Sequence, residues 1–263
     1  MAKNELKVSP EALAKRRFLR RTLGGTGAAL LGGCDRLGAN ASFARLLSTG
    51  ETLSRSVRDA IGGGLAQEFT RADLSPSFRG NGNTDPDSDE YKAMAAAGFA
   101  DWKLVVDGLV DTPMSLTLAA LRAMPARTQI TRHDCVEGWS AIGQWTGVQL
   151  SHVLNLVKPK PTAKYVVFHC ADTFDGEEED TPYYESIDMQ DALHPQTLLA
   201  YALNDQTLPI TNGAPLRLRV ERQLGYKHAK YLMRLELVND FARIGGGKGG
   251  YWEDQGYQWY AGI

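Results

Sequence analysis

Between residues 101 and 238 the chain consists of short segments, each with a regular spacing of apolar and polar residues. These spacings predict both strands and helices. Alternation with a period of two predicts strands over 101–108, 126–135, 164–172, 214–221 and 231–238. Helical spacing of apolar residues predicts helices over 115–124 and 150–157, and a helix with a following segment over 188–203. The pattern contains no internal repeat and no heptad.

Glycine, serine, asparagine and aspartate dominate from residue 40 to about residue 89, which is typical of turns and loops. We expect residues 35–75 to be a tether and 76–90 to be a loop of a domain that covers 76–263. The final stretch, "GGGKGGYWEDQGYQWYAGI", has glycine hinges and many aromatic residues. It predicts a segment that wraps the domain, with its aromatic side chains used for packing.

The first 34 residues have the order of an export signal. The basic stretch "AKRRFLRR" precedes the short apolar run "TLGGTGAALLGGC". The pairs Arg16-Arg17 and Arg20-Arg21 resemble a twin-arginine signal, which carries proteins already folded around their cofactors. The residues "LGGC" resemble a lipobox, in which Cys34 would receive the lipid. We therefore expect a periplasmic or cell-envelope protein, lipid-anchored if Cys34 is modified; the alternative is an uncleaved basic helix.

Charge is distributed unevenly along the chain of 263 residues, whose formal net charge is −2. Residues 1–33 carry seven of the 29 Lys and Arg but only two of the 31 Asp and Glu, so the remainder has a net charge of −7. An acidic folded part is a poor partner for nucleic acid. Its composition, 43% hydrophobic and 23% charged, is that of an ordinary globular protein.

Cys135 stands in an unusual setting, "RHDCVEGWSAIGQW", at the end of a predicted strand and before a Gly-Trp turn. If Cys34 belongs to the signal, Cys135 and Cys170 are the two cysteines of the domain. A thiolate is a soft ligand for a transition metal. His133 lies two residues earlier, on the same face of a strand, so a Cys-His nucleophile is a second interpretation. A disulfide with Cys170 and a structural cysteine remain open.

Residues 212–230, "NGAPLRLRVERQLGYKHAK", concentrate positive charge. Arg217 and Arg219 share one face of the predicted strand, and the following loop carries Lys227, His228 and Lys230. Cations beside a glycine turn suit a phosphate dianion. The alternative is a solvated strand face.

Four stretches together resemble the molybdopterin-binding domain of the sulfite oxidase family. They are "CVEGWSAIGQWTGVQL", "KYVVFHCADTF", "YYESIDMQDALHPQTLLAYALN" and "NGAPLRLRVERQLGYKHAKYLMRLELV". The resemblance covers about residues 76–238 and is closest to the prokaryotic branch that includes protein-methionine-sulfoxide reductase catalytic subunits.

The resemblance implies a mixed α+β, sheet-rich fold with Mo-molybdopterin as cofactor. Cys135 takes the place of the thiolate that binds molybdenum, and Glu137 matches an acid two residues after it. The positions that match contacts to the pterin phosphate are Asn212, Arg217, His228, Ala229 and Lys230. Cys170 matches a residue that touches the cofactor, and Asn81 and Arg79 are the candidates for contacts from the N-terminal loop.

His133 and Asp134 depart from the reductase pattern. We expect these two residues and Glu137 to surround the open coordination position.

The activity implied is oxo transfer at a cysteine-ligated molybdenum centre, with a sulfoxide-type substrate and a membrane or c-type cytochrome as electron partner. Oxidation of sulfite or another small oxyanion is the alternative within enzymes. A non-redox lipoprotein binding module, with a structural Cys135, is the alternative from another class.

Overall fold

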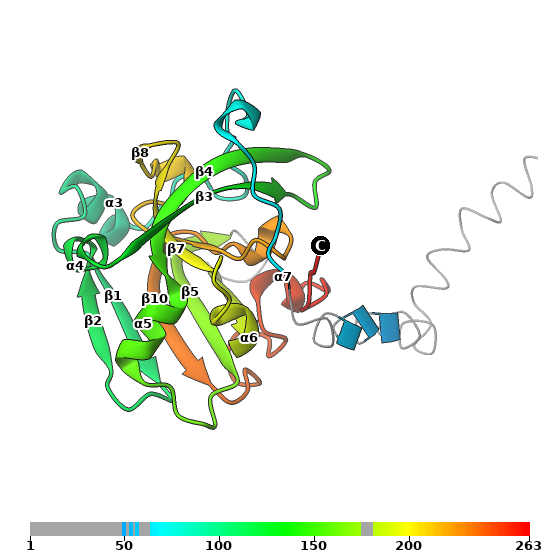
Figure 1. Cartoon of the computed structure of the whole chain (residues 1–263). Coiled ribbons are helices and arrows are strands. Elements are labelled where there is room, and N and C mark those ends of the chain that lie inside the picture. The colour runs from blue at the N-terminus through cyan, green and yellow to red at the C-terminus, as the bar shows by residue number, and fades with distance from the viewer. Residues whose placement is uncertain (1–48, 51–52, 55, 58–63, 175–180) are drawn as a thin grey trace, which may run out of the picture. The chain divides into compact units, whose positions relative to one another are not determined.

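The computed structural model describes residues 49–50, 53–54, 56–57, 64–174 and 181–263 (Figure 1). Residues 1–60 and 61–263 are two compact units. In the first unit, residues 49–50, 53–54 and 56–57 are helical. The predicted export signal and Cys34 lie outside the described residues, so they stay predictions. Within the described ranges, no helix has the length and apolar character needed to cross a membrane.

One sheet of the second unit has five strands in the order β2-β1-β10-β5-β6. The strands are β1 (Lys103–Gly108), β2 (Met114–Thr117), β5 (Tyr165–Phe174), β6 (Thr181–Asp188) and β10 (Leu232–Val238). β1 and β10 are parallel, and the other neighbours are antiparallel. Leu104 and Val106 of β1 are buried whereas Lys103 and Val105 are exposed, which is the alternation expected of a strand with one face in the core.

The other sheet has the order β3-β4-β7-β8, with β9 also paired to β7. Its strands are β3 (Ala126–Asp134), β4 (Ser140–Gln149), β7 (Leu198–Leu203), β8 (Gln206–Thr207) and β9 (Arg217–Arg219). β3 and β4 form a long hairpin (Figure 1), paired without interruption from Ala126–Val148 to Asp134–Ser140. The turn of this hairpin carries Cys135.

Helices are short. The α-helices are α3 (Asp89–Ala96), α4 (Leu118–Ala123), α5 (Leu150–Val157), α6 (Met189–Ala192) and α7 (Tyr251–Asp254), and the 3-10 turns are η1 (Arg71–Asp73), η2 (Ile210–Asn212) and η3 (Gly225–Lys227). α5 buries Leu150, Val153, Leu154 and Val157, the spacing of one helix face. Side chains cap several helices: Ser88 accepts a hydrogen bond from the amide of Tyr91 at the start of α3.

A single large hydrophobic cluster joins the two sheets. It contains Leu104 of β1, Leu235 of β10, Leu199 of β7 and Leu218 of β9, together with the buried face of α5. A smaller cluster around Trp145 includes Ala200, Leu203 and Leu208, with Phe78 packed against it. The mixed α+β, sheet-rich fold predicted from the sequence is confirmed.

Two helix predictions are wrong in part. The segment 115–124 begins as strand β2, paired with β1, and becomes helix α4 only after Thr117, whose hydroxyl caps it. In 188–203 the helix is only the four-residue α6, and Leu198–Leu203 is strand β7. β7 is buried on both faces, so its continuous apolar run carries no period-two signal. β4 and β6 were not predicted.

The segment before residue 76 lies along the β3–β4 hairpin. The amide of Phe69 donates to the carbonyl of Ile130, and that of Ser75 donates to the carbonyl of Ile142. Gln196 exchanges hydrogen bonds with the backbone of Ala66. This part of the predicted tether therefore forms regular contacts with the second sheet, and the domain boundary at residue 76 stays a prediction.

Candidate functional site

A pocket opens beside the hairpin turn that carries Cys135. Segments distant in sequence form its walls: residues 81–83, the 135–137 turn, the end of β5, β6, β9, the 225–230 loop and residues 252–257. One part of the lining is polar, with Asn81, Cys135, Asp172, Arg217, His228 and Lys230. The other part is aromatic, with Phe174, Tyr183, Tyr226, Trp252 and Tyr257.

A tight turn presents the Cys135 thiol. β3 ends at Asp134, the Cys135 amide donates to the Trp139 carbonyl (2.9 Å), and the Gly138 amide donates to the Cys135 carbonyl (3.0 Å). Gly138 has φ +82°, a conformation that favours glycine. The Nδ2 atom of Asn81 lies 3.6 Å from the Cys135 sulfur. Burial raises the pKa of the thiol, whose residue is only 7% exposed.

Cys135 and Cys170 are both free thiols, so the disulfide interpretation is wrong. Cys170 is buried in the hydrophobic cluster rather than in the pocket lining. Burial raises the pKa of its thiol well above the ordinary value.

Three basic side chains line the polar part of the pocket. Arg217 donates from Nη1 to the Asn212 carbonyl (2.9 Å) and from Nη2 to the His228 carbonyl (3.3 Å). Lys230 donates to the carbonyls of Asn81 (2.8 Å) and Asn83. Burial and the neighbouring guanidinium of Arg219 lower the pKa of Arg217 to about 9, and burial and Arg217 lower that of Lys230 to about 7. Such mutually repelling cations are stabilised by an anion.

Among the described residues, two nitrogen atoms in this cluster have no hydrogen-bond partner: Nε of Arg217 and Nδ1 of His228. The other ring nitrogen of His228 lies 3.0 Å from the Gln223 carbonyl, which accepts its proton. Burial lowers the pKa of His228 well below its usual value. Nε of Arg217 is therefore an unused donor in this cluster, as an anion site requires, whereas Nδ1 of the neutral His228 ring is an unused acceptor.

Asp172 is a pocket residue that the sequence reasoning missed. It is 2% exposed, and within the described part of the chain its Oδ1 has no hydrogen-bond partner. Burial raises the pKa of its carboxyl to about 7. Asp172 lies two positions after Cys170 on β5 and therefore on the same face of the strand. This spacing is the sequence signal that could have identified it.

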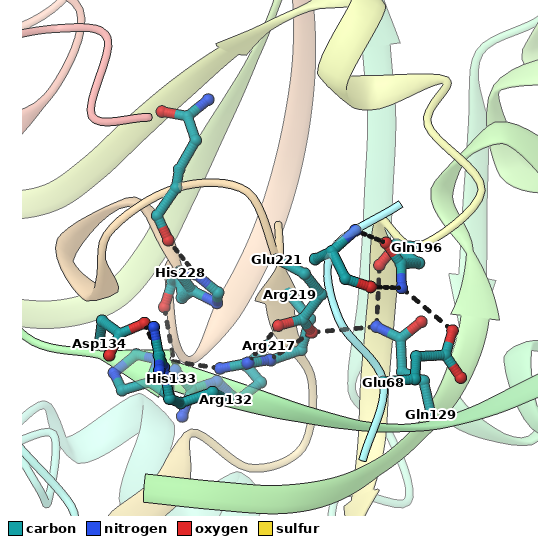
Figure 2. A network of polar contacts seen from close by, with 12 residues as sticks. Glu68, Gln129, Arg132, His133, Asp134, Gln196, Arg217, Arg219, Glu221 and His228 are labelled. Carbon is teal, nitrogen blue, oxygen red and sulfur yellow. Dashed lines mark hydrogen bonds and ion pairs between the residues drawn. The ribbon is translucent and has the colours of Figure 1, made fainter. Parts of the chain in front are cut away.

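His133 and Asp134 do not line the pocket. The His133 ring is buried behind it, 4.9 Å from the His228 ring, and its Nδ1 accepts a hydrogen bond from Nη1 of Arg219 (2.9 Å, Figure 2). Asp134 turns to the outside and binds Ser140 Oγ (2.5 Å) and Arg132 Nε (2.9 Å). The structure thus brings Glu137 to the pocket but leaves the two preceding candidates outside it.

The remaining candidates are placed as follows. Asn212 is buried and donates to the Phe78 carbonyl (3.4 Å), and Ala229 belongs to the hydrophobic cluster. Arg79 covers the Trp139 ring at 4.9 Å and lies 3.8 Å from Glu137, on the exposed side of the turn. Neither Asn212, Ala229 nor Arg79 is part of the pocket lining.

The alternative interpretation of Arg217 and Arg219, a solvated strand face, is wrong, because both arginines are buried. Arg219 binds Glu221 through Nε (2.9 Å) and Nη2 (2.5 Å), and Gln129 also donates to Glu221 (3.0 Å). Figure 2 shows this network extending through Gln196 to Glu68.

Lys227, expected beside a phosphate, is directed elsewhere. Its ammonium group binds the buried carboxylates of Glu185 and Glu253. Glu253 belongs to α7, so this ion pair fastens the C-terminal segment to the 225–227 turn.

Comparisons with known proteins agree on one family. Residues 92–243 match the family described as "Oxidoreductase molybdopterin binding domain". YedZ1 of Azospira oryzae, by its name a subunit of a protein-methionine-sulfoxide reductase, is 40% identical over 259 residues, which are 96% of this chain and 89% of the relative.

Two catalytic subunits named MsrP, for protein-methionine-sulfoxide reductase, are also similar. That of Xanthomonas campestris is 36% identical over 66% of this chain, and that of Campylobacter jejuni is 31% identical over 58%. The matches span 56% and 55% of those relatives' own lengths. Among solved structures, the sulfane dehydrogenase SoxCD of Paracoccus pantotrophus aligns with 54% of this chain and 39% of that chain (TM-score 0.48, 23% identity).

Proposed function

The chain belongs to the oxidoreductase molybdopterin-binding domain family, the sulfite oxidase family that its motifs resemble, and on that premise we propose that it reduces the sulfoxide of oxidised methionine. The observation that carries the proposal is the pocket itself, in which a buried thiol, Cys135, shares a cavity with the cations Arg217 and Lys230. Membership of an oxidoreductase family favours an enzyme over a binding module with a structural cysteine.

The residues of the pocket fit a molybdopterin-type cofactor. The guanidinium of Arg217, whose Nε has no partner, and the ammonium group of Lys230 form an electropositive cradle for the cofactor's phosphate. We propose that Cys135 ligates the metal and that the metal is molybdenum. A metal-bound thiol loses its proton, so its raised pKa does not prevent ligation. When bound, the cofactor supplies a two-electron redox centre able to exchange an oxygen atom with the substrate.

Reduction of a sulfoxide consumes two electrons and two protons: the S=O bond breaks, the sulfur becomes a thioether, and the oxygen leaves as water. Asp172, whose carboxyl has a pKa of about 7, is a pocket group that can exchange protons near neutral pH. Asn81 and Lys230 are joined by a hydrogen bond, which orders the 81–83 loop next to the thiol. The chain's own contribution is therefore to bind, to exclude water and to hold protons.

The electrons come from a separate carrier, for which we propose a membrane or c-type cytochrome in the cell envelope. The "AKRRFLRR" stretch and the run ending at Cys34 support an exported protein with a lipid anchor. The mass of the mature protein from a membrane fraction tests this point: a lipid on Cys34 is expected, and an intact residue 1 in a soluble cell fraction would contradict it.

The decisive experiment uses the full chain matured with its export signal in a host that makes the cofactor. We expect stoichiometric molybdenum, loss of that molybdenum in Cys135→Ser, and reduction of free and protein-bound methionine sulfoxide by a reduced viologen dye. Sulfite oxidation with ferricyanide is assayed in parallel. Sulfite turnover without sulfoxide turnover would overturn the substrate assignment, and metal-free protein would overturn the cofactor assignment.

A further inference from the structure

Charged residues lie deep in the pocket, and the aromatic residue Tyr257 stands near its mouth. Arg217 and Asp172 are each 2% exposed, so the polar part is deep. Tyr257 is 41% exposed and Val136 is 45% exposed, so they stand at the mouth. Cys135, at 7%, lies nearer to the deep part. A cofactor held by its phosphate on the deep cations leaves the aromatic surface to face an incoming substrate.

Two residues of this aromatic surface, Trp252 and Tyr257, come from the C-terminal segment. Both lie outside residues 92–243, the part of the chain that matches the family. Their ring centroids are 5.3 Å apart with an interplanar angle of 30°. Phe174 contacts the Trp252 ring (5.7 Å) and Tyr226 contacts the Tyr257 ring (5.3 Å), so the rings form a continuous wall.

The wall is held in place before any ligand arrives. Glu253, next to Trp252, is buried and accepts a hydrogen bond from Lys227 Nζ (2.5 Å). The Tyr257 amide donates to the Trp252 carbonyl (2.9 Å), and Gly256 between them has φ +103°. Preorganised aromatic surface binds a partner with little loss of conformational entropy.

The chemistry of such a wall selects among sulfur substrates. An alkyl sulfoxide has a polar oxygen, which favours the charged interior, and apolar alkyl groups, which favour aromatic rings through burial and sulfur–aromatic contact. A small oxyanion such as sulfite has no alkyl group to place there. We propose, resting on the function proposed above, that Trp252 and Tyr257 are specificity-determining residues that hold the alkyl groups of the sulfoxide at the mouth.

Steady-state kinetics with a homologous series tests this role. The substrates are dimethyl, methyl ethyl and methyl propyl sulfoxide, and the enzyme is the cofactor-loaded full chain. In the wild type we expect KM to fall about fourfold with each added methylene. In Trp252→Leu and Tyr257→Leu we expect that dependence of KM on chain length to fall below about twofold, with the molybdenum content unchanged.

Trp259→Leu is the matched control. Trp259 is a half-buried tryptophan of the same segment that does not line the pocket. It packs on Tyr165 and Phe241, donates to Ser186 and lies 5.3 Å from Nζ of Lys227, whose ion pair with Glu253 the variant keeps. In the Trp259→Leu control we expect KM to fall with each added methylene as it does in the wild type. If Trp252→Leu does not fold, the more exposed Tyr257 variant carries the test.

Calorimetric binding of methyl propyl sulfoxide to the oxidised, loaded enzyme separates the two proposals. Binding that weakens in Trp252→Leu without any turnover in the wild type leaves the wall assignment standing and overturns the proposed function. If the enzyme turns over sulfoxides and KM depends on alkyl length equally in the wild type and both leucine variants, the wall assignment is overturned. The proposed function then stands. Absence of both binding and turnover overturns both.

Discussion

Arg219 fixes the protonation state of His133. Its guanidinium donates from Nη1 to Nδ1 of His133 at 2.9 Å, and arginine has no acceptor to offer in return. The buried imidazole is therefore neutral, with its proton on Nε2. Burial and the charge of Arg219 lower the pKa of His133 well below its usual value, in agreement with this arrangement.

Replacing Arg219 by methionine should destabilise the protein strongly. The change leaves Glu221 as a buried carboxylate without its main cation, and we expect a loss of about 3–5 kcal/mol in the free energy of unfolding, measured by urea titration. Arg132→Met, on the same hairpin, removes only an exposed ion pair with Asp134 and should cost less than about 1 kcal/mol. Equal losses in the two variants would contradict this account of the network.

Asp172 and Lys230 should give the cofactor-free protein a stability minimum near pH 7. The charge of Lys230 interacts with the Asp172 carboxylate, and the charge of Arg217 interacts with Lys230. The Cys170 thiol also interacts electrostatically with Asp172 and Lys230. The folded-state pKa of Asp172 is raised from 3.8 to about 7, so the folded protein binds the extra proton and stability falls as pH rises through that window. The folded-state pKa of Lys230 is lowered from 10.5 to about 7, so stability rises again above pH 7.

Asp172→Asn should remove the fall in stability between about pH 4 and pH 7, which is the part of the profile that Asp172 causes. At pH 7.5 we expect the cofactor-free variant to be more stable than the wild type, by up to about 4 kcal/mol, and the difference to vanish below about pH 4. Thermal unfolding across pH measures it. A wild-type stability that is flat between pH 4 and pH 7 would contradict the raised pKa.

Gly225 is required by the His133 ring. A Cβ atom at residue 225 would lie 2.6 Å from Nε2 and 2.8 Å from Cε1 of His133, so Gly225→Ala should cost about 1–3 kcal/mol through overpacking. Gly138→Ala is the comparison, because nothing lies within 4 Å of a Cβ there and only the φ of +82° opposes it. We expect about 1 kcal/mol for Gly138→Ala, and a larger loss there than at Gly225 would be evidence against the clash.

Elements with one exposed face were predictable from sequence. β10 and α5 show clean alternation and clean helical spacing, and both formed where expected. β7 was not predicted as a strand, because a strand buried on both faces has a continuous apolar sequence without period-two alternation. Its neighbour α6 ends just before His194 and Pro195.

Some residues of the candidate site were also predictable from sequence, and others were not. Placing His133 beside Cys135 assumed that strand alternation continues to residue 135, but β3 ends at Asp134 and the turn redirects the thiol. Trp252 enters the pocket through long-range packing, which a local pattern does not encode. Arg217, His228 and Lys230 were recognised because they are close in sequence as well as in space.

The ion pair between Lys227 and Glu253 also imposes an order in time. The pair helps to fasten the wall at Trp252 and Tyr257, so the pocket lacks one side until residues 252–257 have docked. A chain in which this segment is still undocked can already hold both sheets and present Cys135, but its pocket is incomplete. A group that needs the whole pocket is therefore expected to bind after this segment has docked.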